Sequence, residues 1–354
     1  MTPDSPTTIR PGEQLDQTAL QTYLNEQVPD AGPITTIEQF PGGYSNLTYA
    51  LTTADDRSYV LRRPPAGAKA IKGGHDMGRE FRVLTLLQQA GYSQIPTPIA
   101  YCEDEAVLGY PFYVMTRVPG VILRAHTAPK LGLQPDTLHQ LSESMVDTLV
   151  ALHAIDISQT GMQQLGKPDG YVQRQVDGWY KRYEASKTDE IPAIDALFRY
   201  LTDALPVSPA PTLLHNDFKY DNVVLNPANL PDVRAVLDWE MCTVGDPLMD
   251  VGTALSYWSE AGDSAFRQSF NLTHLPGNLT RQAFARRYGE RSGRDVSNLL
   301  YYYVFGLFKN AIVMQQIYSR YRRGLTTDPR FAGLLVGVQT LSREGLRSVE
   351  MGTL

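Results

Sequence analysis

The sequence contains the stretch Thr212-Leu213-Leu214-His215-Asn216-Asp217-Phe218-Lys219-Tyr220-Asp221-Asn222-Val223-Val224-Leu225, in which a dense polar octad lies between two apolar runs. Short apolar runs of this kind indicate buried strand-like segments, which would anchor the octad as a loop between them. The polar side chains of such an anchored loop face a cavity. The alternative interpretation is a polar loop with a capped turn and no chemistry.

Two residues of the octad suit phosphoryl transfer. That reaction needs a carboxylate that orients the hydroxyl nucleophile and accepts its proton, and it needs oxygen ligands for magnesium. Asp217 and Asn222 supply one of each, five residues apart. The octad therefore predicts a phosphotransferase loop.

The octad matches the H-x-D-x-K-x-x-N pattern of the protein-kinase catalytic loop at each position. The chain resembles the aminoglycoside phosphotransferase family of kinase-like enzymes, in particular the kinase-like domain that is fused to some acyl-CoA dehydrogenases. The resemblance implies that Asp217 is the catalytic base and Asn222 a magnesium ligand. It also implies that Lys219 contacts the transferring phosphate and that His215 braces the loop.

A second carboxylate follows in Val236-Leu237-Asp238-Trp239-Glu240, where an apolar run ends 21 residues after Asp217. Alone, an aspartate at the end of a strand is more often a turn former or a helix cap. At this distance from the octad, the resemblance implies that Asp238 is the second magnesium ligand. Glu240 completes the Asp-x-Glu version of the motif that the family often has.

The segment Thr243–Asp250 begins the next helix. Asp246 followed by Pro247 reads as an N-cap with proline at the first helical position. We interpret these residues as structural, with Asp250 bracing the catalytic loop. The remaining histidines have no ligand spacing and are read as surface or core residues: His75, His126, His139, His153 and His274.

A glycine-rich turn, Pro41-Gly42-Gly43-Tyr44-Ser45-Asn46, separates the first two expected strands. Glycine lets backbone N–H groups approach a phosphate closely, but Gly-Gly is also common in ordinary hairpin turns. The resemblance makes this turn the nucleotide loop, in which Gly42 and Gly43 approach the phosphates. Ser45 and Asn46 are then expected to contact the β-phosphate.

The chain departs from the family pattern at the third strand, Tyr59-Val60-Leu61-Arg62. Kinase-like enzymes place a lysine there, paired with a helix glutamate, to hold the α- and β-phosphates. Arg62 occupies the lysine position and Glu80 the glutamate position. Arginine is always charged and binds phosphate with two N–H groups, but it is bulkier than lysine. The alternative is a surface ion pair of little energetic value.

Adenine binding is expected where the two halves of the chain join, at Phe112–Gly120. The resemblance makes this segment the interlobe hinge. It implies that Met115 lines the adenine site and that backbone groups near Arg117 and Val118 bind the base. Apolar strand residues alone would not indicate an adenine site.

The order of elements predicts an α+β chain with two unlike halves, and the resemblance implies a bilobal protein-kinase-like fold. An entry helix from Asp16, strand-like runs, and a helical pattern over Asp76–Ala90 give a small antiparallel sheet with one long helix. Long helical patterns then follow Pro119-Gly120, so the second half is a larger, mostly helical lobe. We expect a flexible tail at residues 1–12, a nucleotide-binding lobe at 13–118, and a lobe with the catalytic loop and the acceptor site at 119–354.

The strand-like runs are Ile34–Phe40, Leu47–Thr53, Ser58–Arg63, Thr97–Cys102 and Pro111–Val118. The later helical patterns are Asp136–Ile155, Tyr171–Ser186, Ile191–Leu205, Pro247–Ser259, Leu279–Ser292, Val296–Arg320 and Asp328–Ser348.

Composition excludes several classes of protein. The 354 residues are 42% hydrophobic and 20% charged, and the net charge of -6 argues against nucleic acid as a partner. Only Cys102 and Cys242 are present, without a spacing typical of a metal knuckle or a disulfide framework. No signal peptide and no membrane span are indicated, because the apolar segment Leu299–Ile317 carries Lys309 and Asn310. We expect a cytoplasmic protein.

The acceptor is expected to be a small molecule. No activation segment ending in Ala-Pro-Glu follows Asp238, which argues against a protein kinase. The helical half mixes acids with many arginines and lysines, unlike a cleft built for a polycationic aminoglycoside. The resemblance to the dehydrogenase-fused domains favours a hydroxyacyl or other lipid-like alcohol. One set of aromatic residues belongs either to an apolar acceptor site or to the core: Trp179, Tyr180, Tyr183, Tyr257, Trp258, Tyr301, Tyr302 and Tyr303.

Two functions follow from these motifs. The first is an ATP- and magnesium-dependent transfer of the γ-phosphate to a hydroxyl group, which the intact Asp217, Lys219, Asn222 and Asp238 favour. The alternative is a pseudokinase that binds nucleotide and has a regulatory or interaction role. The sequence does not predict the oligomeric state or the choice between ATP and GTP.

Overall fold

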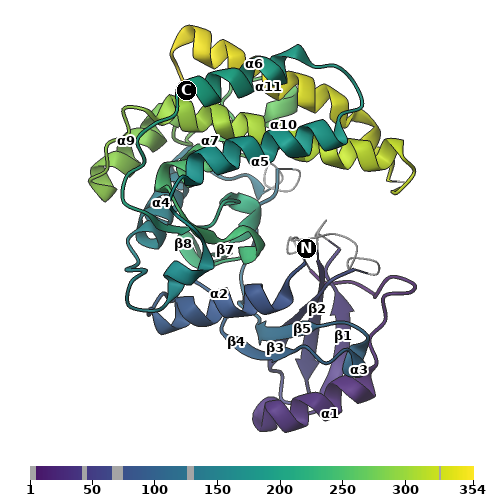
Figure 1. Ribbon diagram of the computed structural model, residues 1–354. Coiled ribbons are helices and arrows are strands. Elements are labelled where there is room, and N and C mark those ends of the chain that lie inside the picture. The colour runs from purple at the N-terminus through teal and green to yellow at the C-terminus, as the bar shows by residue number, and fades with distance from the viewer. Residues whose placement is uncertain (1–4, 42–45, 66–74, 126–130, 327) are drawn as a thin grey trace. The chain divides into compact units, whose positions relative to one another are not determined.

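The computed structural model describes residues 5–41, 46–65, 75–125, 131–326 and 328–354 (Figure 1). The chain divides into two units. The first comprises Met1–Ile122 and Asn222–Met241, and the second comprises Leu123–Asp221 and Cys242–Leu354. Gly42, Gly43, Ser45 and His126 lie outside the described residues.

The first unit is built on a five-stranded antiparallel sheet. Neighbouring strands follow the order β1-β2-β3-β5-β4, so the first three form the meander expected from the sequence. The strands are β1 (Ile34–Gln39), β2 (Leu47–Thr53), β3 (Ser58–Arg63), β4 (Pro98–Cys102) and β5 (Phe112–Thr116).

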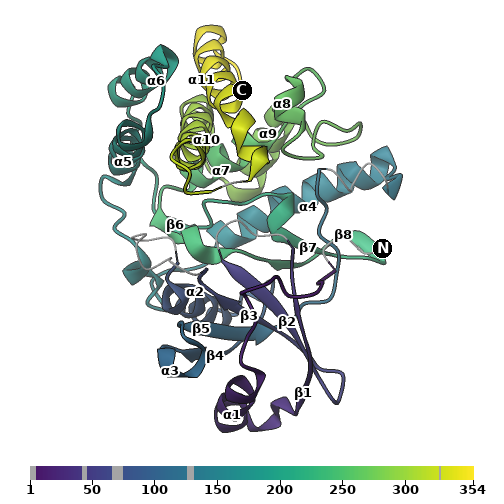
Figure 2. The same ribbon diagram turned by 90° about the vertical axis from the view of Figure 1, so that its right-hand side faces the viewer.

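Two helices of the first unit cover opposite faces of this sheet (Figure 2). Helix α1 (Gln17–Gln27) buries its apolar residues in one core with Phe112 and Val114 of β5. Tyr113, between them, donates a hydrogen bond to Glu80 of helix α2 (Met77–Gln89). Successive side chains of a strand point to opposite faces, so α1 and α2 lie on different sides. The side chains of Asp16 and Asp76 cap the two helices.

Residues 222–241 return to the first unit as a hairpin. Strand β7 (Val223–Asn226) pairs with β8 (Asn229–Val236), and Val121 forms a bridge with Leu225. The hairpin is also held by Gln94, whose side chain donates to the carbonyl of Val233 and whose own carbonyl accepts from the amide of Val236. A short 3-10 turn at Trp239–Met241 follows β8. Two further short elements of this unit, Pro29–Ala31 and α3 (Glu105–Leu108), were not predicted.

The second unit is mostly helical, as predicted, and helix α10 lies at its centre. Helix α10 packs against α7, α11 and α5. A side chain at Gly252 of α7 or Gly306 of α10 would overlap the backbone of the other helix, so glycine permits the close crossing. The helices are α4 (Pro135–His153), α5 (Tyr171–Ser186), α6 (Pro192–Asp203), α7 (Pro247–Tyr257), α8 (Ala265–Gln268), α9 (Arg281–Ser292), α10 (Leu299–Arg322) and α11 (Leu334–Met351), with 3-10 turns at Met162–Leu165, Tyr220–Asn222 and Pro329–Gly333.

A two-stranded sheet positions the start of the octad within the helical unit. Strand β6 (Thr212–Leu214) pairs antiparallel with β9 (Thr243–Gly245). The first of these strands was predicted, whereas Thr243–Gly245 was expected only as the approach to a helix. Asp246 caps α7 through the amide of Leu248, with Pro247 in the first turn, as predicted. Within the described residues, no helix is long and apolar enough to span a membrane.

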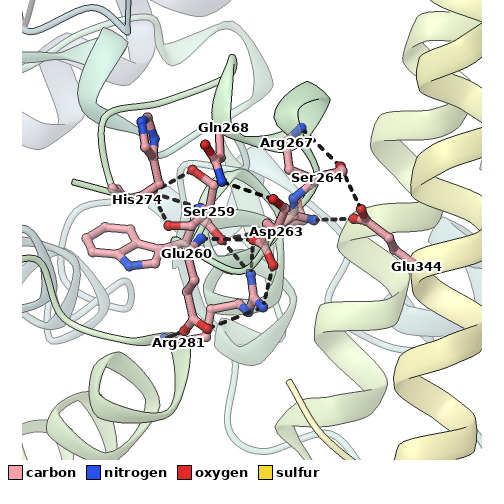
Figure 3. A network of polar contacts seen from close by, with 12 residues as sticks. Ser259, Glu260, Asp263, Ser264, Arg267, Gln268, His274, Arg281 and Glu344 are labelled. Atoms are coloured by element: carbon pink, nitrogen blue, oxygen red, sulfur yellow. Dashed lines mark hydrogen bonds and ion pairs between the residues drawn. The ribbon is translucent and has the colours of Figure 1, made fainter. Parts of the chain in front are cut away.

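Two buried arginines join the end of α7 to α8, α9 and α11 (Figure 3). Arg281 donates two hydrogen bonds to Asp263, and both Arg281 and Arg267 donate to the carbonyl of Trp258. Arg267 also lies 3.6 Å from Glu344 of α11. This network fixes the backbone that immediately follows Tyr257.

Candidate active site

The backbone that leads into Asp217 is held by a buried carboxylate of α7. The amides of His215 and Asn216 donate to the two oxygens of Asp250 at 2.6 and 2.8 Å. Asn216 has a φ of 63°, a left-handed conformation that asparagine tolerates better than most residues. The two hydrogen bonds hold the loop in this turn, and they confirm the expected bracing by Asp250.

His153, which was expected only as a surface or core histidine, completes this brace. His153 of α4 is buried, its Nε2 lies 3.2 Å from Asp250 Oδ2, and its Nδ1 lies 2.8 Å from the Tyr288 hydroxyl. Burial acts to raise the pKa of Asp250, but the hydrogen bonds from His153 and from the His215 backbone outweigh it and lower that pKa. Asp250 therefore stays ionised as an acceptor for the loop amides.

The carboxylate of Asp217 meets two side chains of the second unit. Lys219 Nζ lies 2.9 and 2.8 Å from its two oxygens, and the hydroxyl of Tyr257 donates to Oδ1 at 2.8 Å. The Lys219 ammonium also lies 4.7 Å from the centre of the Tyr257 ring. Burial opposes ionisation of Asp217, but Lys219 lowers the pKa of Asp217 below its ordinary value. Lys219 was expected near this site, whereas Tyr257 was expected only as part of an aromatic acceptor site or of the core, and its contact with Asp217 was not predicted.

His215 is fully buried beneath the loop. Its Nδ1 accepts a hydrogen bond from the amide of Asp217 at 3.2 Å, and its ring packs edge-on against Phe218. These contacts turn the backbone between His215 and Asp217. They are the contacts expected of a structural brace.

The remaining candidate residues belong to the first unit, where Arg62 contacts two carboxylates. Its guanidinium lies 3.1 Å from Glu80 and 3.1 Å from Asp238. Arg62 and Glu80 are buried, so the alternative of a surface ion pair is wrong. Burial acts to lower the pKa of Arg62, but the charges of Glu80 and Asp238 raise it well above its ordinary value. The contact with Asp238 was not predicted.

Asn46, at the end of the glycine-rich turn, is also buried in this network. Its amide donates to Glu80 at 2.9 Å and to Glu240 at 3.2 Å, and its Oδ1 lies 2.8 Å from His75 Nδ1. The Asn46 side chain therefore links Glu80 to Glu240.

Asn222 and Asp238 are adjacent in the first unit because the amide of Leu237 donates to the carbonyl of Asn222 at 2.8 Å. Asp238 has a φ of 67°, an uncommon conformation that often marks a functional position. An amide oxygen and a carboxylate are suitable donors for magnesium, which usually takes few protein ligands and completes its shell with phosphates and water. Among the described residues, no three His, Cys, Asp or Glu side chains form a cluster that would hold a metal by themselves.

The hinge segment continues from β5. Met115 is buried and pairs with Val60 across the sheet, and the amide of Arg117 donates to the carbonyl of Ser58 at 3.1 Å. The Arg117 guanidinium lies 5.6 Å from the centre of the Phe40 ring. Because the amide of Arg117 is already bonded within the sheet, Val118 is the better candidate for a backbone contact with a ligand.

The antiparallel sheet with its helix and the helical second unit define a kinase-like phosphotransferase fold. A model of the phosphotransferase enzyme family matches residues 36–286. A solved structure of a provisionally assigned aminoglycoside phosphotransferase from Ralstonia eutropha JMP134 is 31% identical, with a TM-score of 0.81 over 96% of this chain and 99% of that chain. The chain therefore belongs to the phosphotransferase enzyme family, which supports a kinase-like phosphotransfer activity and confirms the predicted fold class.

Two further similarities concern longer or more distant proteins. Acyl-CoA dehydrogenase family member 11 from Rattus norvegicus is 34% identical over 347 residues, which cover 96% of this chain but 44% of that protein. The chain thus spans less than half the length of this relative. The ternary complex of streptomycin, ATP and APH(2″)-IIa has a TM-score of 0.56 at 18% identity and covers 85% of this chain and 90% of that chain. This last likeness shows a shared fold.

Proposed function

We propose that the protein transfers the γ-phosphoryl group of ATP to a hydroxyl group of a small molecule, with Asp217 as the catalytic base. The observation that carries this proposal is the Asp217 carboxylate on a loop held by Asp250, with Lys219 at both of its oxygens. The family membership and the ATP complex of a protein with the same fold support ATP as the phosphate donor.

Asp217 is suited to this chemistry because its pKa is low and its position is fixed. An ionised carboxylate accepts a hydrogen bond from the acceptor hydroxyl and orients its oxygen. The oxygen forms the new bond to the γ-phosphorus while the bond to the β,γ-bridging oxygen of ATP breaks. The hydroxyl proton passes to Asp217, and ADP leaves with the bridging oxygen.

We assign the phosphate and metal contacts to Lys219 and to residues of the first unit. Asn222 and Asp238 would hold magnesium, which neutralises phosphate charge when it is bound. Lys219 would contact the transferring phosphate. Arg62, oriented by Glu80, would bind the α- and β-phosphates, and the glycine-rich turn with Gly42, Gly43, Ser45 and Asn46 would cover them.

The nucleotide base is assigned to the hinge of the first unit. Met115 would line the adenine site, and the backbone at Arg117 and Val118 would contact the base. The amide of Arg117 donates to Ser58, which supports Val118 and the carbonyl of Arg117 as the groups that contact adenine.

The charges of the helical unit argue against a polycationic acceptor. Asp263 and Glu260 are paired with Arg281, and Glu184 and Glu190 both lie 3.4 Å from Lys187. Neighbouring cations offset part of this negative charge, which weakens the field that would attract the ammonium groups of an aminoglycoside. Most of the aromatic set is core, because six members are almost fully buried: Trp179, Tyr183, Trp258, Tyr301, Tyr302 and Tyr303.

A hydroxyacyl or other lipid-like alcohol is the acceptor that we propose. The support is the similarity to an acyl-CoA dehydrogenase family member over 96% of this chain. We also propose a reducing, cytoplasmic compartment, which is supported by the low number of cysteines in the sequence, Cys102 and Cys242, both of which are buried.

The test is transfer of labelled phosphate from ATP to a panel of hydroxyacyl thioesters, with choline and kanamycin as acceptors of other classes. We expect a labelled hydroxyacyl product that depends on magnesium. Asp221→Asn is the matched control for Asp217→Asn, because Asp221 belongs to the same loop and lies 3.8 Å from Arg124. Equal amounts of labelled product from wild type and from Asp217→Asn would contradict the role of Asp217 as the base. ATP binding without transfer to any acceptor would favour a pseudokinase.

A further inference from the structure

Helix α10 carries a lysine in the interior of the helical unit. Lys309 is 3% exposed, and its Nζ donates a hydrogen bond to the carbonyl of Asn216 at 2.6 Å. The same ammonium lies 5.8 Å from the centre of the Trp179 ring. An ammonium group in the core is costly unless its interactions compensate for the lost water.

The carbonyl that Lys309 contacts belongs to the peptide group between Asn216 and Asp217. The N–H of that peptide group donates to His215 Nδ1. The preceding amides of His215 and Asn216 donate to Asp250. The peptide group that precedes the proposed base is thus held at its carbonyl by Lys309 and at its amide by His215.

The charged groups around Lys309 decide whether its side chain is protonated. Asp217 and Asp250 favour its cationic form, whereas Lys219 and Arg182 oppose it. Within the described part of the chain, no carboxylate lies close enough to form an ion pair with Lys309. Burial therefore prevails and lowers the pKa of Lys309 to about 8, so the group is still protonated at pH 7.

We propose that Lys309 is a positioning residue, which orients Asp217 through the carbonyl of Asn216 and places a positive charge behind the base. This inference rests on the proposed function of Asp217. The charge of Lys309 also contributes to the low pKa of Asp217, after the contribution of Lys219. A methionine would fill similar space without burying a charge, so the lysine is better explained by what it does for the loop than by stability.

The variants Lys309→Met and Lys309→Arg test the proposal, with Gln315→Met as the matched control. Gln315 also lies buried on α10 and donates to a backbone carbonyl, that of Ser186. We expect Lys309→Met to lower kcat by roughly tenfold to a hundredfold, since small displacements of a catalytic group cost this much. KM for Mg-ATP and the unfolding temperature should stay near the wild-type values. Lys309→Arg should recover part of kcat, and Gln315→Met should leave kcat within about twofold.

The pH profile separates positioning by a charged group from simple packing. In the wild type, kcat should fall by about fivefold as Lys309 loses its proton above pH 8, because a charge-assisted hydrogen bond becomes a neutral one. Arginine stays charged, so Lys309→Arg should not show this alkaline fall. An identical alkaline fall of kcat in Lys309→Met, Lys309→Arg and wild type would overturn the proposal.

Amide hydrogen exchange gives a measurement that is independent of catalysis. Exchange at His215 and Asn216 should accelerate in Lys309→Met and stay unchanged in Gln315→Met. If the wild type transfers phosphate to no acceptor, the proposed function fails, and the exchange result alone decides whether Lys309 positions the loop. Unchanged exchange in Lys309→Met, or a loss of kcat that follows a matching loss of thermal stability, would overturn the inference.

Discussion

Replacing Arg62 with methionine should destabilise the first unit strongly. Arg62 lies 3.1 Å from Glu80, and both side chains are buried. Removal of one partner of a buried ion pair leaves an uncompensated charge, which costs about 3–5 kcal/mol. Asn46 and Tyr113 still donate to Glu80 in the variant, so we take the lower end, about 3 kcal/mol. The contact with Asp238 adds little, because that side chain is 32% exposed.

The assay is thermal unfolding by calorimetry. A loss of about 3 kcal/mol should lower Tm by roughly 4 to 10 °C, depending on whether the whole chain or the first unit alone unfolds in the transition. The double variant Arg62→Met/Glu80→Gln removes both charges and should recover at least half of this loss. Arg62→Lys keeps a point charge and should fall between wild type and Arg62→Met.

The loss in Arg62→Met should depend on pH in a defined direction. Burial already raises the pKa of Glu80, and removal of Arg62 raises it further. A carboxyl group with a raised pKa in the folded state binds more protons there than in the unfolded state, so its cost is relieved as the pH falls. The deficit should therefore shrink between neutral pH and pH 5. A Tm of Arg62→Met within 1 °C of wild type would refute this reasoning. The same holds if the loss of unfolding free energy in the double variant equals the sum of the losses in Arg62→Met alone and Glu80→Gln alone.

Three further predictions concern the proposed site. Asp217→Asn should abolish phosphate transfer, while the affinity for Mg-ATP in calorimetric titration stays within a few fold of wild type, because the base acts on the acceptor. Strongly weakened ATP binding would contradict this role. Asp238→Ala should weaken Mg-ATP binding as well as turnover, since it removes a proposed metal ligand, and an unchanged affinity would count against the assignment. Asp250→Asn should lower the free energy of unfolding by about 1.5–3 kcal/mol, because the amides of His215 and Asn216 lose their ionised acceptor. A denaturation midpoint like that of wild type would show that the brace contributes little.

Local patterns in the sequence determined much of the fold and part of the site. The octad places Asp217, Lys219 and Asn222 within six consecutive residues, so their association needs no knowledge of the fold. Helix starts were predictable for the same reason, because the Asp16, Asp76 and Asp246 caps bond to amides two or three residues away. The ion pair of Arg62 with Glu80 followed from the family pattern rather than from periodicity.

Only the tertiary structure decided which distant residues support these groups. Lys309 reaches Asn216 across 93 residues, His153 reaches Asp250 across 97, and Tyr257 reaches Asp217 across 40. Periodicity identifies the buried face of each helix, but it does not say which neighbour that face meets. Strand β9 was missed because Thr243-Val244-Gly245 is too short to alternate and, unlike the equally short β6, contains no run of apolar residues. A buried polar side chain in an apolar helix, such as Lys309, indicates that a partner exists, and packing alone determines which group it is.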